Sequence, residues 1–171
     1  NKSDVSGLKQ LEQQEQISLY MLLFSAYIHF LQQVSGQQNL VVGTPVTGRQ
    51  HESFEDIQGF FVNTVAIRVH TAGASTMEAL CKKVKEKCLL AFQHQSYPFD
   101  RVIQDVNPER GDHMNPIFST MFSYQQDAIQ QHPTYHYQIH PVNTNISKFD
   151  LSLACEEIDD ELLIHFEYAT D

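Results

Sequence analysis

The feature that most constrains the fold is the stretch of residues 17–34, which is apolar on nearly every side of the helix that its spacing predicts. A helix with apolar side chains all round has to be buried, so other elements must surround it. Gly36 follows as the kind of residue on which helices commonly end. The apolar members of the helix include Leu19, Leu22, Leu23, Ala26, Tyr27, Phe30 and Leu31. The rest of the chain must therefore provide a layer against which this helix packs.

Segments in which apolar and polar residues alternate predict the strands of that layer. They cover residues 61–70, 117–124, 149–157 and 162–168. The last two are joined by an acidic turn, which predicts an antiparallel hairpin. A short strand at residues 40–42 is expected to lead into a shaped loop at 43–49, because glycine and proline there oppose regular structure. The Gln-rich and Glu-rich residues before position 17 form a polar approach to the first helix.

Two further helices are predicted. Ser75 and Glu78 form a capping box that opens a helix reaching to about residue 93. Its apolar positions are Met77, Leu80, Val84, Cys88, Ala91 and Phe92, and its lysines are expected to face solvent. A short helix at residues 100–106 stops before Asn107, because Pro108 restricts its predecessor. Residues 1–171 are thus predicted to form one α/β domain, a mixed sheet with flanking helices.

Charge and hydropathy exclude two classes of protein. Lys and Arg number 11 against 21 Asp and Glu, and the net charge of -10 would repel a nucleic-acid backbone. The most apolar stretch, residues 19–31, is too short and too polar to cross a bilayer, which needs about 20 apolar residues. The first residues also lack the apolar core of a signal peptide. We expect a soluble, cytoplasmic protein that binds neither nucleic acid nor membrane.

Common catalytic and metal-binding patterns are absent from the sequence. The three cysteines include no CxxC pair, which argues against a zinc ribbon and a disulfide framework. His132, His136 and His140 are four residues apart, but Pro133 and Pro141 bracket an alternating segment, so exposed strand positions are favoured over a zinc site. No serine-hydrolase elbow, phosphate-binding loop or zinc-protease helix occurs. The acidic pairs at 156–157 and 159–160 lie in or beside the hairpin turn and are explained by solvation.

Asn63 is the polar exception on the otherwise apolar face of the strand predicted at residues 61–70. A buried amide without partners costs about 1–3 kcal/mol, so this side chain must find hydrogen bonds. Either it pins a neighbouring loop or it lines a cavity.

Several segments resemble the condensation domains of nonribosomal peptide synthetases. Residues 59–68, GFFVNTVAIR, resemble the fifth core motif of that family, and residues 94–100, HQSYPFD, resemble the sixth, with Ser96 where an acid is usual. Residues 107–118, NPERGDHMNPIF, resemble the seventh, and they keep Arg110, Asn115 and Pro116 but depart from the usual pattern at Gly111, His113 and Met114. VVGTPVTGR at 41–49 and KFDLSL at 148–153 resemble further family segments. The resemblance covers nearly the whole chain.

The resemblance implies a lobe similar to chloramphenicol acetyltransferase, one of two that face each other across a cleft with a tunnel. The family's catalytic HHxxxDG motif belongs to the N-terminal lobe. None of the nine histidines here is adjacent to another, and none begins an HxxxDG pattern. Residues 1–171 are therefore expected to be a C-terminal lobe without the N-terminal one, carrying no catalytic histidine and inactive alone.

By the same resemblance, the lobe serves amide formation between an acyl or peptidyl thioester and an aminoacyl thioester in antibiotic biosynthesis. Both substrates ride on phosphopantetheine arms of upstream and downstream carrier proteins, so no cofactor or metal is expected to bind the lobe directly. Asn115 is the candidate assisting residue, and the candidate tunnel-lining residues are Gly59, Phe61, Asn63 and Thr64. Simpler roles remain open, with Asn115 capping a turn and Asn63 and Thr64 pinning a loop.

Two other functions remain open from the sequence. The lobe could be a noncatalytic module that docks a carrier protein. It could also be an ordinary acyltransferase acting on free thioesters, which the FVNT and KFDL segments fit less well.

Overall fold

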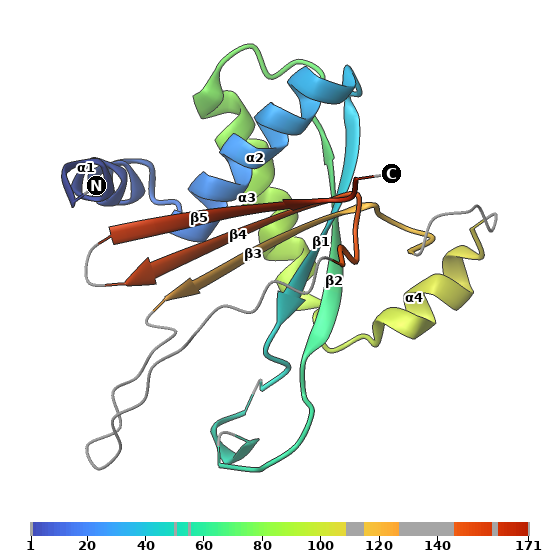
Figure 1. The fold of residues 1–171 in the computed structure, drawn as a ribbon. Helices are drawn as coiled ribbons and strands as arrows, with labels where there is room; N and C mark the ends of the chain where they lie inside the picture. Colours follow the sequence, from blue (N-terminus) through green and yellow to red (C-terminus); the bar gives the residue numbers. More distant parts are fainter. Residues whose placement is uncertain are drawn as a thin grey trace.

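The computed structural model describes residues 2–49, 51–54, 56–108, 115–126, 146–158 and 161–170. In chain order the elements are α1 Lys2–Glu15, α2 Leu19–Ser35, β1 Asn39–Val46, the 3₁₀ turn η1 Glu52–Phe54, β2 Asn63–His70, α3 Met77–Gln93, α4 Phe99–Val106, β3 Thr120–Gln126, β4 Leu151–Ile158 and β5 Glu161–Tyr168 (Figure 1). The predicted segment around His136, the three histidines and the part of the seventh motif at 109–114 lie outside the described residues.

The strands form one five-stranded mixed sheet in the order β2-β1-β3-β4-β5. β1 pairs antiparallel with β2 and β4 pairs antiparallel with β5, each along eight residue pairs, and β3 runs parallel to β4. β1 and β3 are also parallel, but these two described strands pair only at Gly43 and Met121. Figure 1 shows the result, with β1 and β2 lying steeply in the view while β3, β4 and β5 extend toward the left as a second group of strands. The predicted mixed α/β sheet and the final hairpin are confirmed.

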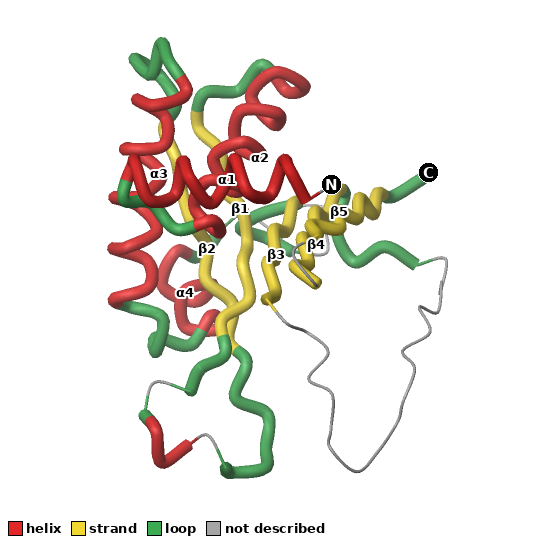
Figure 2. Tube along the Cα trace, turned by 90° about the vertical axis from the view of Figure 1, so that its left-hand side faces the viewer, coloured by secondary structure: helices red, strands yellow, loops and turns green. Residues whose placement is uncertain are grey.

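The core lies where α2 and α3 pack against one face of this sheet (Figure 2). Phe24 and Ile28 of α2, Val84 of α3 and Phe122 of β3 are fully buried. The expectation that residues 17–34 form a buried helix is confirmed, although its last turn is less covered, since Val34 is 71% exposed. Ser18 caps the start of α2 by accepting from the Met21 N–H, and Gly36 ends it with φ of 67°.

The capping box predicted for α3 is wrong by one residue. Thr76, in an extended conformation, accepts from the N–H of Ala79 and is the N-cap. Glu78 does not reach back to Ser75, because it pairs with Lys82 one turn later at 2.5 Å. Met77 was also expected on the buried face, yet it is 45% exposed at the start of the helix. The helix boundary therefore holds, but its first turn is stabilised by a different side chain.

The loop predicted at residues 43–49 is wrong in its first half. β1 extends to Val46 and keeps pairing with β2, with Gly43 opposite Ala66 and Pro45 opposite Thr64. A proline is tolerated in a strand where the strand has only one partner, and β3 has already separated from β1 at this point. The strand therefore continues to Val46 because β2 pairs with it, a contact that the local sequence does not reveal.

The helix α1 was not expected, since its segment is rich in Gln and Glu. It forms because Val5 is 2% exposed and Leu8 packs against the core, so the helix has a narrow apolar side. Lys9 also pairs with Glu157 of β4 at 2.7 Å. Glu157 is only 5% exposed, so the expectation that solvation explains the acidic pair at 156–157 is wrong for this residue. Three smaller differences concern strand starts, because β2 begins at Asn63, β3 at Thr120 and β4 at Leu151, each slightly later than the alternation predicted.

Among the described residues, no single helix has both the length and the apolar content needed to cross a membrane. α1 and α2 pass such a test only as a pair, and the two helices are bent by 101°.

Candidate functional site

The side chain of Phe118 is the point at which the family-like segments meet. It is 4% exposed and lies just before β3. Its ring contacts Phe99 at the start of α4, with centroids 5.5 Å apart, and Phe149 ahead of β4, with centroids 5.7 Å apart. A Cβ at Gly43 of β1 would lie 2.3 Å from the Phe118 ring, so only glycine fits there. We call Gly43, Phe99, Phe118 and Phe149 the aromatic junction.

Asn115 orients Phe118 within this junction. Its Oδ1 accepts from the backbone N–H of Ile117 at 3.0 Å and of Phe118 at 3.3 Å. This is the local side-chain turn that Asn favours. Asn115 therefore caps a turn, which is the simpler role considered for it, and it does so through its side-chain carbonyl oxygen.

Asn63 lies at the first position of β2 and bonds to the turn between α3 and α4. Its Nδ2 donates to the carbonyl oxygens of Gln95 at 2.8 Å and Tyr97 at 2.9 Å. Its Oδ1 accepts from the N–H of Phe99 at 3.2 Å. Both amide hydrogens and the oxygen are thus engaged by one short segment. Of the two alternatives for this residue, the one in which it pins a neighbouring segment is confirmed.

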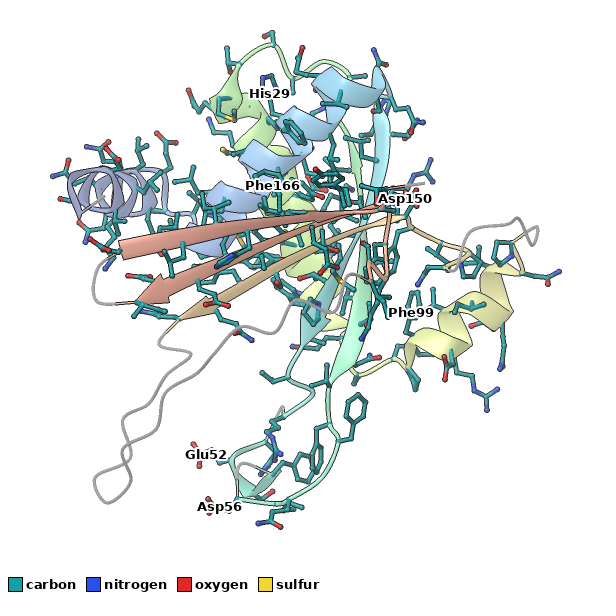
Figure 3. All side chains as sticks on the ribbon, in the orientation of Figure 1. His29, Glu52, Asp56, Phe99, Asp150 and Phe166 are labelled. Atoms are coloured by element: carbon teal, nitrogen blue, oxygen red, sulfur yellow. The ribbon has the colours of Figure 1, made fainter. Side chains whose placement is uncertain are left out.

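Between β1 and β2 the chain projects from the sheet as the β1–β2 extension, described for residues 47–49, 51–54 and 56–62 (Figures 1 and 3). The Arg49 guanidinium lies 4.3 Å from the centroid of the Phe61 ring, and this ring stacks on Phe54 at 5.9 Å. Arg49 also donates to the carbonyl oxygen of Phe54. Gly48 adopts φ of 67°, and a Cβ there would overlap the backbone oxygen of Phe61. The extension is therefore held in a defined shape by its own side chains.

The extension also presents apolar side chains to the surface. Phe60 is 90% exposed, and Ile57 and Val62 are about half exposed. Large exposed apolar groups that gather in one place are typical of surfaces that meet another protein or a ligand. Gly59 lies beside the Phe61 ring, and Thr64 follows Asn63 in β2 opposite Pro45.

The separation of β1 from β3 leaves backbone groups beyond Gly43 and Met121 outside the ladder between these two described strands. Tyr20 of α2 spans the two strands on the helix side, where its hydroxyl donates to Thr44 at 3.1 Å and its ring meets Phe122. Burial raises the pKa of the Tyr20 hydroxyl, so it remains protonated. Such a divergence offers an extended, amide-bearing chain a place to make hydrogen bonds.

The β1–β2 extension contains one histidine among its described residues, His51, whose Nδ1 shares a hydrogen bond of 3.1 Å with the Ser53 hydroxyl. Among the described residues no cluster of His, Cys, Asp or Glu could hold a metal ion. Burial raises the pKa of the Cys88 thiol to about 12, so this thiol is a core group and not a nucleophile. A shallow hollow lined by Asn39, Arg68, His70 and Lys87 lies at the far ends of β1 and β2 from the extension.

The sequence matches the Condensation domain family over residues 1–171. The chain belongs to the condensation domain family. It is 39% identical over 165 residues to tyrocidine synthase 3 of Brevibacillus parabrevis, which covers 95% of this chain and 2% of that protein. It is 34% identical to bacitracin synthase 1 of Bacillus licheniformis, across 95% of this chain and 3% of that protein. The chain thus spans a small part of the curated relatives that it matches.

Solved structures of condensation domains share the fold. A four-domain nonribosomal peptide synthetase bound to AMP and glycine superposes with a TM-score of 0.86 at 28% identity, over 98% of this chain and 14% of that one. The first condensation domain of the CDA synthetase gives a TM-score of 0.72 at 16% identity, over 98% of this chain and 38% of that one. The resemblance to condensation domains of nonribosomal peptide synthetases and the expected fold class are confirmed.

The structure brings some predicted site residues together and adds others. Asn63 and Asn115 are linked through Phe99 and Phe118, while Gly59, Phe61 and Thr64 belong to the extension or its base. Their assignment to a tunnel, and that of Asn115 to catalysis, stay predictions. The sequence did carry a signal for the residues that were missed, since Gly43, Phe99, Phe118 and Phe149 all lie within the quoted segments.

Proposed function

We propose that this chain is the C-terminal lobe of a condensation domain that joins a carrier-bound acyl or peptidyl thioester to a carrier-bound aminoacyl thioester. The observation that carries the proposal is the family match over residues 1–171, together with the meeting of the family-like segments at one aromatic junction. The amine nitrogen attacks the thioester carbon, a C–N bond forms, the C–S bond breaks, and the thiol leaves on the upstream arm. The amine must lose a proton in the process.

The proton-handling histidine belongs, in this proposal, to an N-terminal lobe, because the sequence contains no HHxxxDG. This lobe supplies the opposite wall of the cleft. Its β1–β2 extension forms part of the tunnel floor, with Gly59 and Phe61 facing the substrates and Asn63 and Thr64 at its base. Enclosure of the two thioesters raises their effective concentration and keeps water from hydrolysing them.

The phosphopantetheine arms are proposed to pass where β1 and β3 diverge. An arm of this kind carries amide groups, and the strand edges beyond Gly43 and Met121 offer N–H and C=O groups to such a chain. The partners would be the N-terminal lobe and the upstream and downstream carrier proteins, and the setting would be the cytoplasm. The product would belong to the same class as the compounds for which two relatives are named, tyrocidine and bacitracin.

Asn115 is proposed to assist from the opposite wall. Its Oδ1 is engaged in the turn, which leaves Nδ2 as the group that could donate toward the reacting carbonyl. Asn115→Asp keeps the acceptor of the turn and removes the donor. If this donor stabilises the developing oxyanion, turnover falls by about 100-fold while the unfolding midpoint stays near that of the wild type.

The test of the function is amide formation by the full-length protein that carries this sequence. Two carrier proteins, one loaded with an acyl group and one with an amino acid, are mixed with the protein, and the product on the downstream carrier is detected by mass spectrometry. Product formation by the full-length protein, and none by residues 1–171 alone, is the expected result. Carrier binding without product would refute amide formation and favour a docking lobe, and turnover by residues 1–171 alone would refute the division into two lobes.

A further inference from the structure

Few contacts hold the helix α4 in place. None of its eight residues, all of which the structure describes, is buried. Its N-cap position is Pro98, which makes no side-chain cap hydrogen bond. A helix start without a cap leaves backbone N–H groups to be satisfied by other means. Within the described residues, α4 is attached by the ring contact between Phe99 and Phe118 and by the hydrogen bond of 2.5 Å from the Tyr97 hydroxyl to Asp105. The Tyr97 bond ties α4 to the α3–α4 turn and not to the sheet.

Asn63 attaches the start of α4 to the strand β2. By accepting from the Phe99 N–H at 3.2 Å, its Oδ1 acts as a cap for α4 from another element of the fold. By donating to the carbonyls of Gln95 and Tyr97, its Nδ2 fixes the turn that leads into the helix. Three hydrogen bonds from one amide to one five-residue segment leave that segment little freedom relative to β2.

Asn63 also stands at the base of the β1–β2 extension. It follows directly on residue 62, and the extension is made rigid by the stacking of Arg49, Phe54 and Phe61. The same residue therefore connects the extension on one side with the start of α4 on the other. A shift at Asn63 would change the placement of the extension and of α4 relative to each other.

We infer that Asn63 is a positioning residue, whose amide holds the β1–β2 extension and the α3–α4 turn in one fixed geometry for the carrier-bound substrates. The inference rests on the proposed condensation activity and gives Asn63 a role different from lining the tunnel. A residue of this kind acts on the orientation of bound substrates more than on their binding. Its loss should lower kcat more than it raises KM.

The side-chain geometry provides a sharp variant. Asn63→Asp has nearly the same shape and can still accept from the Phe99 N–H, but it replaces two donors by an oxygen facing the carbonyls of Gln95 and Tyr97. Asn63→Ala removes all three hydrogen bonds without introducing charge. Asn107→Asp is the matched control, because Asn107 lies exposed at the other end of α4 with φ of 44°, a conformation that Asp also tolerates.

The experiment uses the full-length protein with two loaded carrier proteins and measures kcat and KM for the downstream, aminoacyl carrier. Hydrogen exchange of residues 95–101 and of α2 is measured on the same variants, below the temperature at which any of them unfolds. For Asn63→Asp and Asn63→Ala we expect kcat to fall by about 10-fold to 100-fold, as for a displacement near 1 Å. Exchange should accelerate in residues 95–101 and remain unchanged in α2.

The outcomes separate this inference from the proposed function. If the wild-type protein forms the amide and kcat is unchanged in both Asn63 variants, the inference is overturned and the proposed function stands. The inference is also overturned if exchange accelerates throughout α2, since the residue would then be only a general stabiliser. A wild-type protein that forms no amide overturns the function, and with it the catalytic half of the inference. An equal fall of kcat in Asn107→Asp would show that any added charge at α4 lowers turnover, which contradicts a specific role for Asn63.

Discussion

Replacing Gly43 by alanine tests the aromatic junction directly. The added Cβ would lie 2.3 Å from two atoms of the Phe118 ring, whereas carbon atoms in contact are about 3.5–4.0 Å apart. The ring would have to retreat by more than about 1 Å. Phe118 is 4% exposed and has an aromatic ring on either side, so it has little room to move. Gly43→Ala should therefore force a rearrangement of the junction.

The cost can be worked out from the structure. Overpacking by a methyl group costs about 1–3 kcal/mol, and the confined ring places Gly43→Ala near the upper end. Alanine also lowers the conformational entropy of the unfolded chain, and this offsets about 0.4–1 kcal/mol of the overpacking cost. We expect a net loss of about 2 kcal/mol in the free energy of unfolding. Gly7→Ala in α1 is the control, since nothing among the described residues lies within 4 Å of its added Cβ, and it should be neutral or stabilising.

Urea unfolding followed by far-ultraviolet circular dichroism is the suitable assay, because the sequence contains no tryptophan. The double variant Gly43→Ala with Phe118→Leu completes a cycle. If the clash with the ring is the cause, the two changes together should cost at least about 1 kcal/mol less than the sum of the single changes. Additive effects, or a Gly43→Ala protein as stable as the Gly7→Ala control, would refute the packing argument.

Two further predictions concern stability. Glu157→Gln should weaken the attachment of α1, because it removes the charge that pairs with Lys9 at 2.7 Å from a nearly buried carboxylate. Limited proteolysis checks this, since cleavage should become faster only within residues 2–15. Unchanged cleavage there would contradict it. Burial raises the pKa of the Cys88 and Cys155 thiols to about 12 and about 11. An unfolded thiol titrates near pH 8.5–9, so their contribution to stability is complete below that pH and is lost as pH rises toward the folded values. Urea midpoints should fall between pH 9 and 11, and both thiols should resist labelling at pH 8 until the protein unfolds; fast labelling of the native protein would disprove this.

The elements that sequence patterns predicted well are those whose periodicity reflects burial. Apolar residues all round the segment 17–34 required a covered helix, and Phe24 and Ile28 are fully buried there. The alternation on either side of the acidic turn gave the hairpin of β4 and β5, because that hairpin buries one side of β4. In both cases the local pattern and the final packing agree.

Predictions failed where the structure depends on distant partners. Gly43 and Pro45 are ordinary signals for a loop, yet both lie in β1, since Gly43 makes room for a ring 75 positions away and Pro45 lies where β3 has separated. The helix α1 has a polar sequence and is held by Val5 and by the pair of Lys9 with a strand near the other end of the chain. Local propensity contains no information about such contacts.

The candidate site was predictable to a similar degree. An amide on an apolar face indicated that Asn63 must bond to something, but the identity of the partners required the position of the α3–α4 turn. The turn made by Asn115 could be anticipated from its place before proline. What no pattern indicated is that Asn63 and Asn115 accept from the backbone N–H groups of Phe99 and Phe118, whose rings contact each other.

This arrangement has a mechanical consequence for the lobe. α4 has no buried residue of its own among the described positions, and its first turn is attached to the sheet by Phe99 packing on Phe118 and by the amide of Asn63. In its last turn, Asp105 accepts a hydrogen bond from Tyr97 of the α3–α4 turn. Phe118 in turn is fixed by the Asn115 turn and by the absence of a side chain at Gly43. Because these contacts form one series, we expect a change at any of these positions to shift α4, while the buried cluster around α2 and α3 does not include Phe99, Phe118 or Phe149. We therefore expect the protein to be able to lose the geometry of its candidate site and still remain folded.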